Sequence, residues 1–247
     1  MFLSLHKIEN NLKKMEQLQL QKVNVGDIVA DDFRTSLLFK NAGIDFCCGG
    51  KQTLADACFD KGINVDDLEG KLKKVMDEPV NPGMNFKEWE PGFLCDYIVN
   101  THHKFVLKNM PELVFYTNKI ATVHGDHHPE LVEVANLFAQ INTELLQHLK
   151  KEEEVFFPSI KEVVATGSSK AKETIHSEIK RLSGEHDFAG GAMDEINKIT
   201  SAYKLPEDAC KTYQVTFKLL EQFEDDLHVH VHLENNILFP KAIELAD

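Results

Sequence analysis

Hydrophobic residues recur at three- and four-residue spacing along most of the chain, as in Leu219, Phe223 and Leu227. This period is typical of amphipathic α-helices, and the alternating pattern of strands is nearly absent. The pattern predicts four long helices, over 92–124, 128–163, 169–201 and 206–245. Four long helices with short connections favour an all-α, up-down-up-down four-helix bundle.

A stretch rich in proline and glycine, DEPVNPGMNFKEWEPG at 77–92, precedes the long helices and predicts a linker. Shorter helical patterns lie before it, at 31–43, 51–62 and 65–78, and an amphipathic segment occupies 5–21. The predicted organisation is an N-terminal extension at 1–22, a small helical domain at 23–78, a linker at 79–91 and the bundle at 92–247.

The composition and charge of the chain argue against some classes of binding partner. The chain carries 40 acidic against 27 basic side chains, a net charge of −13, and no long basic patch, which argues against nucleic-acid and membrane-surface partners. No apolar run is long enough for a membrane span, and the N-terminus lacks the pattern of a secretory signal. The five scattered cysteines are typical of reduced thiols, so we expect a cytoplasmic protein.

The pattern H-x3-E-x4-F-P occurs twice, from His148 to Pro158 and from His230 to Pro240. Residues four apart in a helix differ by about 40° in direction and about 6 Å in height, so each imidazole and carboxylate share one face. Two such faces turned inward bring two histidines and two glutamates together. A single copy is more often a solvated charged face, but two copies with the same Phe-Pro favour a metal site.

Imidazole with carboxylate is a ligand set that suits iron, manganese or zinc, and bundles rich in carboxylates can hold di-iron centres. The other two long helices carry His102-His103 and His186. The intervals from His103 to His148, His186 and His230 are 45, 38 and 44 residues, which is one helix and turn each. All four histidines can therefore meet at one level of the bundle.

The segments DFCCGGKQTLADAC, THH, HLKKEE, FFP, SGEHD and HLENNILFP together resemble the repair-of-iron-centres family, in which a hemerythrin-like domain follows a CCGG domain. The resemblance covers 23–245. It implies a non-haem centre of two iron ions, bridged by carboxylates and an oxo group. The implied ligands are His103, His148, Glu152, His186, His230 and Glu234.

The same resemblance implies a protein that repairs iron–sulfur clusters damaged by oxidative or nitrosative stress, by donating iron. Its partners would be damaged iron–sulfur proteins, with nitric oxide or oxygen as small ligands, and a homodimer is consistent with the small domain. Two alternatives stay open: a hemerythrin-like module that binds oxygen or nitric oxide, and an enzyme such as a nitric-oxide reductase or ferroxidase.

The remaining cysteines and histidines receive individual predictions. Cys47-Cys48, followed by two glycines and an expected helix start, is the candidate catalytic pair, with a thiol pKa lowered by the helix end. A buried structural pair is the alternative. We expect the other three cysteines, Cys58, Cys95 and Cys210, to be buried. Among the remaining histidines, we expect His127 and His128 to be exposed to solvent, and His228 and His232 to be either exposed or behind the ligands.

Overall fold

The computed structural model describes residues 20–78 and 85–247. These residues form two compact units that divide after Trp89, inside the predicted linker. Within the described ranges there is no strand, and only an isolated antiparallel bridge pairs Asn24 with Thr53. The prediction of an all-α protein is therefore confirmed. The predicted N-terminal extension lies outside the described residues apart from positions 20–22.

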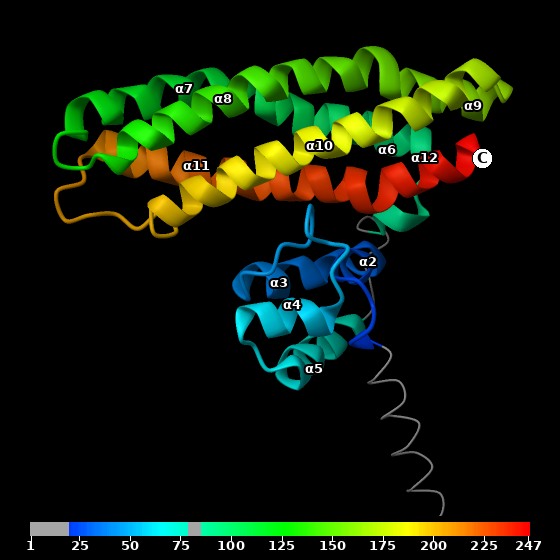
Figure 1. Cartoon of the computed structure of the whole chain (residues 1–247), viewed down its shortest axis with the longest axis horizontal. Coiled ribbons are helices and arrows are strands. Elements are labelled where there is room, and N and C mark those ends of the chain that lie inside the picture. Colours follow the sequence, from blue (N-terminus) through cyan, green and yellow to red (C-terminus); the bar gives the residue numbers. More distant parts are fainter. Residues whose placement is uncertain (1–19, 79–84) are drawn as a thin grey trace, which may run out of the picture. The chain divides into compact units, whose positions relative to one another are not determined.

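The smaller unit consists of short helices. They are α2 (Val25–Asp31), the 3-10 turn η1 (Phe33–Thr35), α3 (Ser36–Asn41), α4 (Leu54–Lys61), α5 (Val65–Met76) and the 3-10 turn η3 (Phe86–Glu88) (Figure 1). The Thr53 hydroxyl accepts a hydrogen bond from the Asp56 N–H and begins α4, and Gly62 ends it with a φ of 65°. Sequence reasoning missed α2, because seven residues are too few to show a helical period.

The larger unit contains the four predicted long helices, three of which are interrupted (Figure 1). The first runs through α6 (Pro91–Ile98), η4 (Val99–His103) and α7 (Lys104–His124), and the second through α8 (Glu130–Lys151), η5 (Glu152–Phe156) and α9 (Phe157–Thr166). The third is α10 (Ser169–Ile199), and the fourth runs through α11 (Lys211–Leu233), η6 (Glu234–Leu238) and α12 (Phe239–Ala246).

The connection between the third and fourth helices is longer than predicted. Ser201, Ala202 and Tyr203 all have positive φ values, of 52°, 57° and 58°, and so end the right-handed helix. The fourth helix begins at Lys211 rather than at 206, with Cys210 as its N-cap residue.

Each interruption is a single turn of π-helix. The N–H of Phe157 donates to the carbonyl of Glu152, five residues back, and Phe239 donates to Glu234 in the same way. The proline that follows each phenylalanine has no N–H, so it cannot make the next α-helical hydrogen bond. The Phe-Pro of the repeat therefore marks the place where the helix changes its hydrogen bonding. Such turns occur often at functional sites.

Buried apolar side chains from all four long helices fill the centre of the bundle. Phe138 of α8 meets Phe223 of α11 edge to face, with ring centroids 5.3 Å apart, and both are almost fully buried. This packing fixes the rotation of each helix, which decides which side chains point inward.

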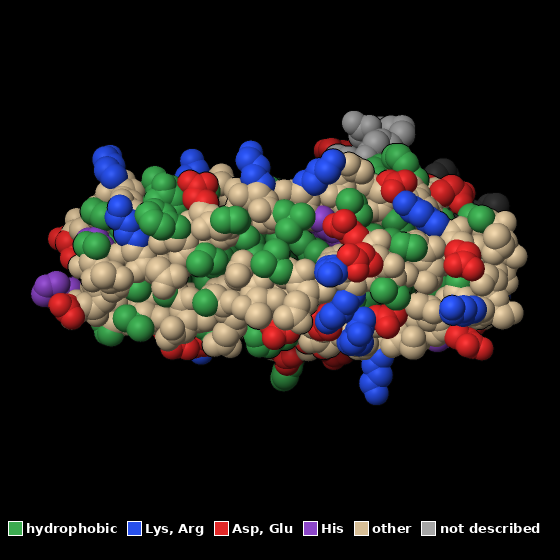
Figure 2. All heavy atoms as spheres, turned by 90° about the horizontal axis from the view of Figure 1, so that it is seen from above, with side chains coloured by type: hydrophobic (Ala, Val, Ile, Leu, Met, Phe, Trp, Pro, Cys, Tyr) green, Lys and Arg blue, Asp and Glu red, His purple; other side chains and the backbone are tan. Residues whose placement is uncertain are grey.

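Among the described residues, no helix combines the length and apolar character needed to cross a lipid bilayer. On the face shown in Figure 2, basic and acidic side chains are intermixed along the helices. Positive charge on this face is therefore not gathered into one area, as nucleic-acid binding would require.

Candidate metal centre

Four histidines and two glutamates from the four long helices converge inside the bundle. Each is at most 1% exposed to solvent. They are His103 at the end of η4, His148 on α8, Glu152 at the start of η5, His186 on α10, His230 on α11 and Glu234 at the start of η6. The structure thus brings together all six residues that the sequence indicated as metal ligands.

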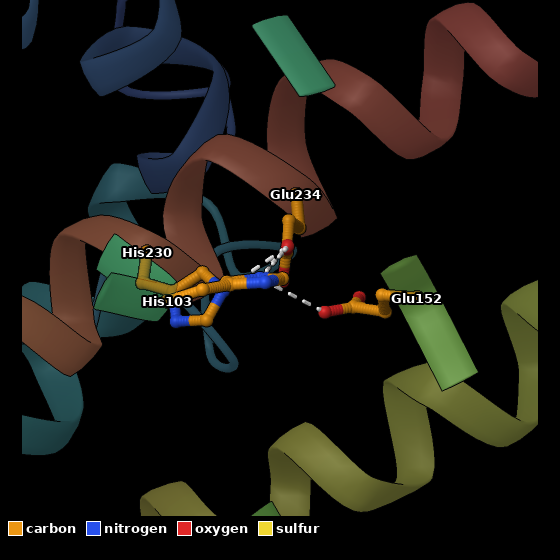
Figure 3. A group of neighbouring side chains, drawn as sticks. All are labelled: His103, Glu152, His230 and Glu234. Atoms are coloured by element: carbon orange, nitrogen blue, oxygen red, sulfur yellow. Dashed lines mark hydrogen bonds and ion pairs between the residues drawn. The ribbon is translucent and has the colours of Figure 1, made fainter. Parts of the chain in front are cut away.

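The six side chains form two groups that share both glutamates. The first group adds His103 and His230, whose imidazoles face the two carboxylates (Figure 3). His103 Nε2 lies 3.4 Å from Glu152 Oε2 and 4.0 Å from Glu234 Oε1. His230 Nε2 lies 3.1 Å from Glu234 Oε1. All ligand atoms of this group lie within 4.8 Å of one another.

The second group adds His148 and His186 to the same glutamates. His148 Nε2 lies 3.2 Å from Glu152 Oε2, and His186 Nε2 lies 3.1 Å from Glu234 Oε2. The two Nε2 atoms are 3.0 Å apart. Glu234 therefore presents one oxygen to each group, which is the arrangement of a carboxylate between two cations.

Three of the four histidines form a hydrogen bond through Nδ1, on the side away from the centre. The partners are Glu153 for His103, Glu185 for His148 and Asn235 for His186, at 2.8, 2.9 and 2.9 Å. Each bond places an N–H on Nδ1 and turns Nε2 toward the centre, as is usual for histidine ligands. Sequence reasoning missed these partners, although each is the sequence neighbour of a ligand on another helix.

Aromatic rings cover the centre. Phe157 stacks on His103 with ring centroids 5.6 Å apart, and Phe239 stacks on His186 at the same distance with its plane inclined by 7°. These are the two phenylalanines of the repeated Phe-Pro. The repeat therefore supplies a ligand pair, a π-helical turn and an apolar cover at each occurrence.

The electrostatics of the group keep the carboxylates ionised. Burial disfavours the charged form of Glu234, but hydrogen bonds from the surrounding imidazoles of His103, His186 and His230 hold its pKa well below the usual range. The pKa of Glu152 is also lowered, since His148 and His103 outweigh burial and the charge of Glu234.

The pKa shifts of the histidines at the centre differ in direction. Burial disfavours the imidazolium form of His103 and His148, but the nearby carboxylates overcome this and raise the pKa of each to about 10. For His230 burial dominates, so its pKa is lowered. Without a cation, two protons on histidine therefore balance the two buried carboxylates.

The donor set fits a pair of metal ions. Several buried polar atoms at the centre have no hydrogen-bond partner of good geometry: both oxygens of Glu152, Glu234 Oε2 and His103 Nε2. Such atoms are costly in a protein interior unless something satisfies them. A cation bound to each group would do so, and imidazole with carboxylate suits iron, manganese or zinc.

Comparison with known proteins agrees with this geometry. Residues 96–242 match the family model described as the hemerythrin HHE cation binding domain, and residues 21–76 match a domain of unknown function, DUF542. The iron-sulfur cluster repair protein ScdA of Staphylococcus epidermidis is 33% identical over 219 residues, covering 88% of this chain and 96% of the relative. The iron-sulfur cluster repair protein YtfE of Pectobacterium atrosepticum is 33% identical over 223 residues, covering 89% and 96%.

The chain belongs to the iron–sulfur cluster repair protein family. Its larger unit is a hemerythrin HHE cation binding domain, so the resemblance drawn from the sequence motifs is confirmed. A more distant relative has the same name, the YtfE protein of Escherichia coli O81, at 32% identity over 222 residues.

Two histidines outside the six candidate ligands, His102 and His232, are also buried. His102 is 4% exposed, donates or accepts through Nδ1 at 3.0 Å from Asp226 Oδ1, and stacks on His230 at 5.6 Å. His232 is fully buried and His228 is half-buried, so neither is exposed. As predicted, His127 is exposed, whereas His128 is half-buried because Glu130 and Asp208 hold it.

Of the three cysteines predicted to be buried, one is not. Cys58 and Cys95 are buried as expected, but Cys210 is exposed, with its sulfur 3.2 Å from His124 Nε2. The reason is the later start of the fourth helix: Cys210 lies at the N-cap in the connection, not on the inward face of a helix.

The loop that carries Cys47 and Cys48 is organised by Asp45. Asp45 Oδ1 accepts hydrogen bonds from the N–H groups of both cysteines and from Cys47 Sγ, while Oδ2 accepts from Gly49 N–H. The predicted low thiol pKa is wrong for Cys47, because the neighbouring Cys48, burial and the Asp45 charge raise its pKa well above the usual value. The helix also begins only at Leu54, too far to favour a thiolate.

Proposed function

We propose that this protein holds a non-haem di-iron centre and repairs iron–sulfur clusters damaged by oxidative or nitrosative stress by donating iron to them. The observation that carries the proposal is the pair of buried two-histidine groups sharing Glu152 and Glu234. The family relatives named as iron–sulfur cluster repair proteins support the same conclusion.

Iron suits the centre for chemical reasons. Each ion would receive two imidazoles and a share of two carboxylates, a set that iron accepts readily and that hemerythrin-like bundles use. Iron prefers more ligands than these four, so positions stay open for water, oxygen or nitric oxide. Bound iron supplies a redox-active ion with open positions, and it is also the cargo to be transferred.

The residues around the centre allow iron to leave without unfolding the bundle. When iron departs, His103 and His148 take up protons, since their pKa without metal is about 10. These protons offset the charge of the two carboxylates and stabilise the iron-free protein. Glu153 and Glu185 hold the rings in place throughout, through the Nδ1 hydrogen bonds.

We further propose damaged iron–sulfur proteins as the partners, the cytoplasm as the location and Cys47 with Cys48 as the pair that acts during transfer. All five cysteines are free thiols, as a reducing compartment requires. Because Cys47 is buried and its pKa is raised, it acts as a thiol until a partner or oxidant changes its surroundings.

The test is transfer of labelled iron. Protein loaded with iron-57 is mixed anaerobically, without free iron, with an enzyme whose four-iron cluster has lost one iron. A chemical reductant is added to supply the one electron that an oxidised three-iron cluster needs to take up Fe²⁺. Recovery of that enzyme's activity, with iron-57 in its cluster and loss of the same amount from the donor, supports the proposal. A matched sample of the Glu234→Ala variant should transfer little. Recovery without label in the cluster, or none at all, contradicts iron donation.

The same preparation distinguishes the alternatives. A nitric-oxide reductase would consume nitric oxide through many cycles when supplied with a reductant, whereas a donor delivers its iron once. Steady consumption of nitric oxide with the iron-57 retained would favour the enzyme.

A further inference from the structure

A further cluster of side chains of metal-ligand type lies between α10 and α11, apart from the candidate metal centre. It consists of Asp194 on α10 with Glu224 and His228 on α11, and one ligand atom from each lies within 4.8 Å of the others. Glu224 and His228 are four residues apart, so both project from one face of their helix. None of the three belongs to the centre.

Glu224 is buried although it is a carboxylate, with 4% of its surface exposed. Asn197 Nδ2 donates to Glu224 Oε2 at 3.0 Å, and burial nevertheless raises the pKa of this carboxyl. A buried carboxylate is costly unless a positive group approaches it. The carboxylate of Asp194 is exposed and the imidazole of His228 is half-buried, so the cluster reaches from the interior to solvent.

The side chain of Tyr203 lies next to this cluster. Its hydroxyl is buried beside Glu224 and Asn197, yet it makes no hydrogen bond of good geometry. The ring is held there by the left-handed turn of Ser201, Ala202 and Tyr203 and by Phe217, at 6.1 Å between centroids. Left-handed backbone in three successive residues other than glycine is rare, and such strain gathers at functional sites.

The donor atoms of this cluster favour binding of a divalent metal ion. Two carboxylates and one imidazole are the donors that divalent ions of the first transition series accept in proteins. Three protein ligands leave positions open on the side of Asp194, where water can enter and the ion can exchange.

We propose that Asp194, Glu224 and His228 form a further binding site for a divalent transition-metal ion, separate from the centre and open to solvent. The buried carboxylate of Glu224 anchors the ion, and Asp194 with His228 completes the site from the surface. Its occupancy needs neither iron transfer nor repair activity, so it stands or falls independently of the proposed function.

The test is a titration of the iron-loaded full chain with Mn²⁺, followed by the loss of the free Mn²⁺ signal in electron paramagnetic resonance. Manganese is the suitable probe because it prefers oxygen and imidazole donors, so thiols such as Cys47 and Cys48 compete poorly. The iron content is measured before and after, which shows whether Mn²⁺ has entered the centre.

The variants Asp194→Asn and His228→Asn remove one ligand each, and Glu195→Gln is the matched control. Glu195 is a neighbour on the same helix with the same charge, and it pairs with Lys198 instead. We expect one saturable Mn²⁺ per chain at unchanged iron content, with affinity lowered about tenfold or more by each ligand variant but not by the control.

Three results overturn the proposal. The first is an absence of saturable Mn²⁺ binding beyond the centre. The second is binding that both ligand variants leave unchanged. The third is binding that Glu195→Gln weakens as much as Asp194→Asn does, since that indicates general attraction to an acidic surface.

Discussion

Loading the metal-free protein at different pH values tests the charge balance of the centre. His103 and His148 have a pKa of about 10 without metal, so both carry a proton at pH 7. Metal binding needs neutral imidazoles, and each must lose that proton. The carboxylates of Glu152 and Glu234 are already ionised and His230 is already neutral, so these three release none.

The number of protons released determines how strongly the apparent metal affinity depends on pH. Two protons leave from His103 and His148 as the centre fills, so apparent affinity rises about 100-fold for each pH unit. That is about 2.7 kcal/mol per unit, at about 1.36 kcal/mol for each proton. The sign is fixed by the raised pKa values: binding strengthens as pH rises toward 10 and weakens as pH falls.

Anaerobic calorimetry of Fe²⁺ binding, between pH 6 and 8 in buffers of different ionisation enthalpy, measures the protons released. We expect about two per filled centre from this pair. The variant His148→Asn should release about one fewer, whereas His176→Asn, at an exposed histidine, should leave the number unchanged. Release of less than about one proton by the parent, or equal release by parent and His148→Asn, would refute the reasoning.

Three further predictions concern single residues. Glu185→Gln weakens the hydrogen bond to His148 Nδ1. It should lower iron affinity about 10- to 100-fold in a chelator competition and leave the free energy of unfolding unchanged. Unaltered iron affinity would show that this bond does not orient the ring. Phe239→Ala removes a side chain that is 3% exposed, and it should lower the free energy of unfolding by about 3–5 kcal/mol in denaturant titrations. A loss under about 1 kcal/mol would mean that the neighbouring side chains fill the cavity. Cys210 is exposed and Cys58 is buried, so iodoacetamide should label Cys210 in the folded protein much faster, as peptide mass analysis would detect, and equal rates would contradict the structure.

The long helices were predictable because their core faces repeat every three or four residues over many turns. The same period fixed His148 with Glu152, and His230 with Glu234, on common faces. The agreement of the Phe-Pro positions in the two copies strengthened the prediction, and in the structure that dipeptide follows the same π-helical turn both times.

Other features could not be predicted from one sequence. The π-helical turn that ends at His103 has no proline after it, so nothing in the local pattern indicates it. The partners Glu153 and Glu185 lie on other helices from the histidines they contact, and only packing brings them together. The connection near Tyr203 departs from the prediction because its residues adopt left-handed backbone without glycine, the usual signal for it.

Iron content per chain tests the central claim most directly. The protein is purified from iron-replete cells beside His148→Ala and Glu234→Ala, with His176→Ala as the control at an exposed histidine. We predict about two irons per chain in the parent and in the control, and clear losses in both ligand variants. Iron absent from the parent, or equal in all four proteins, would contradict a di-iron centre at these residues.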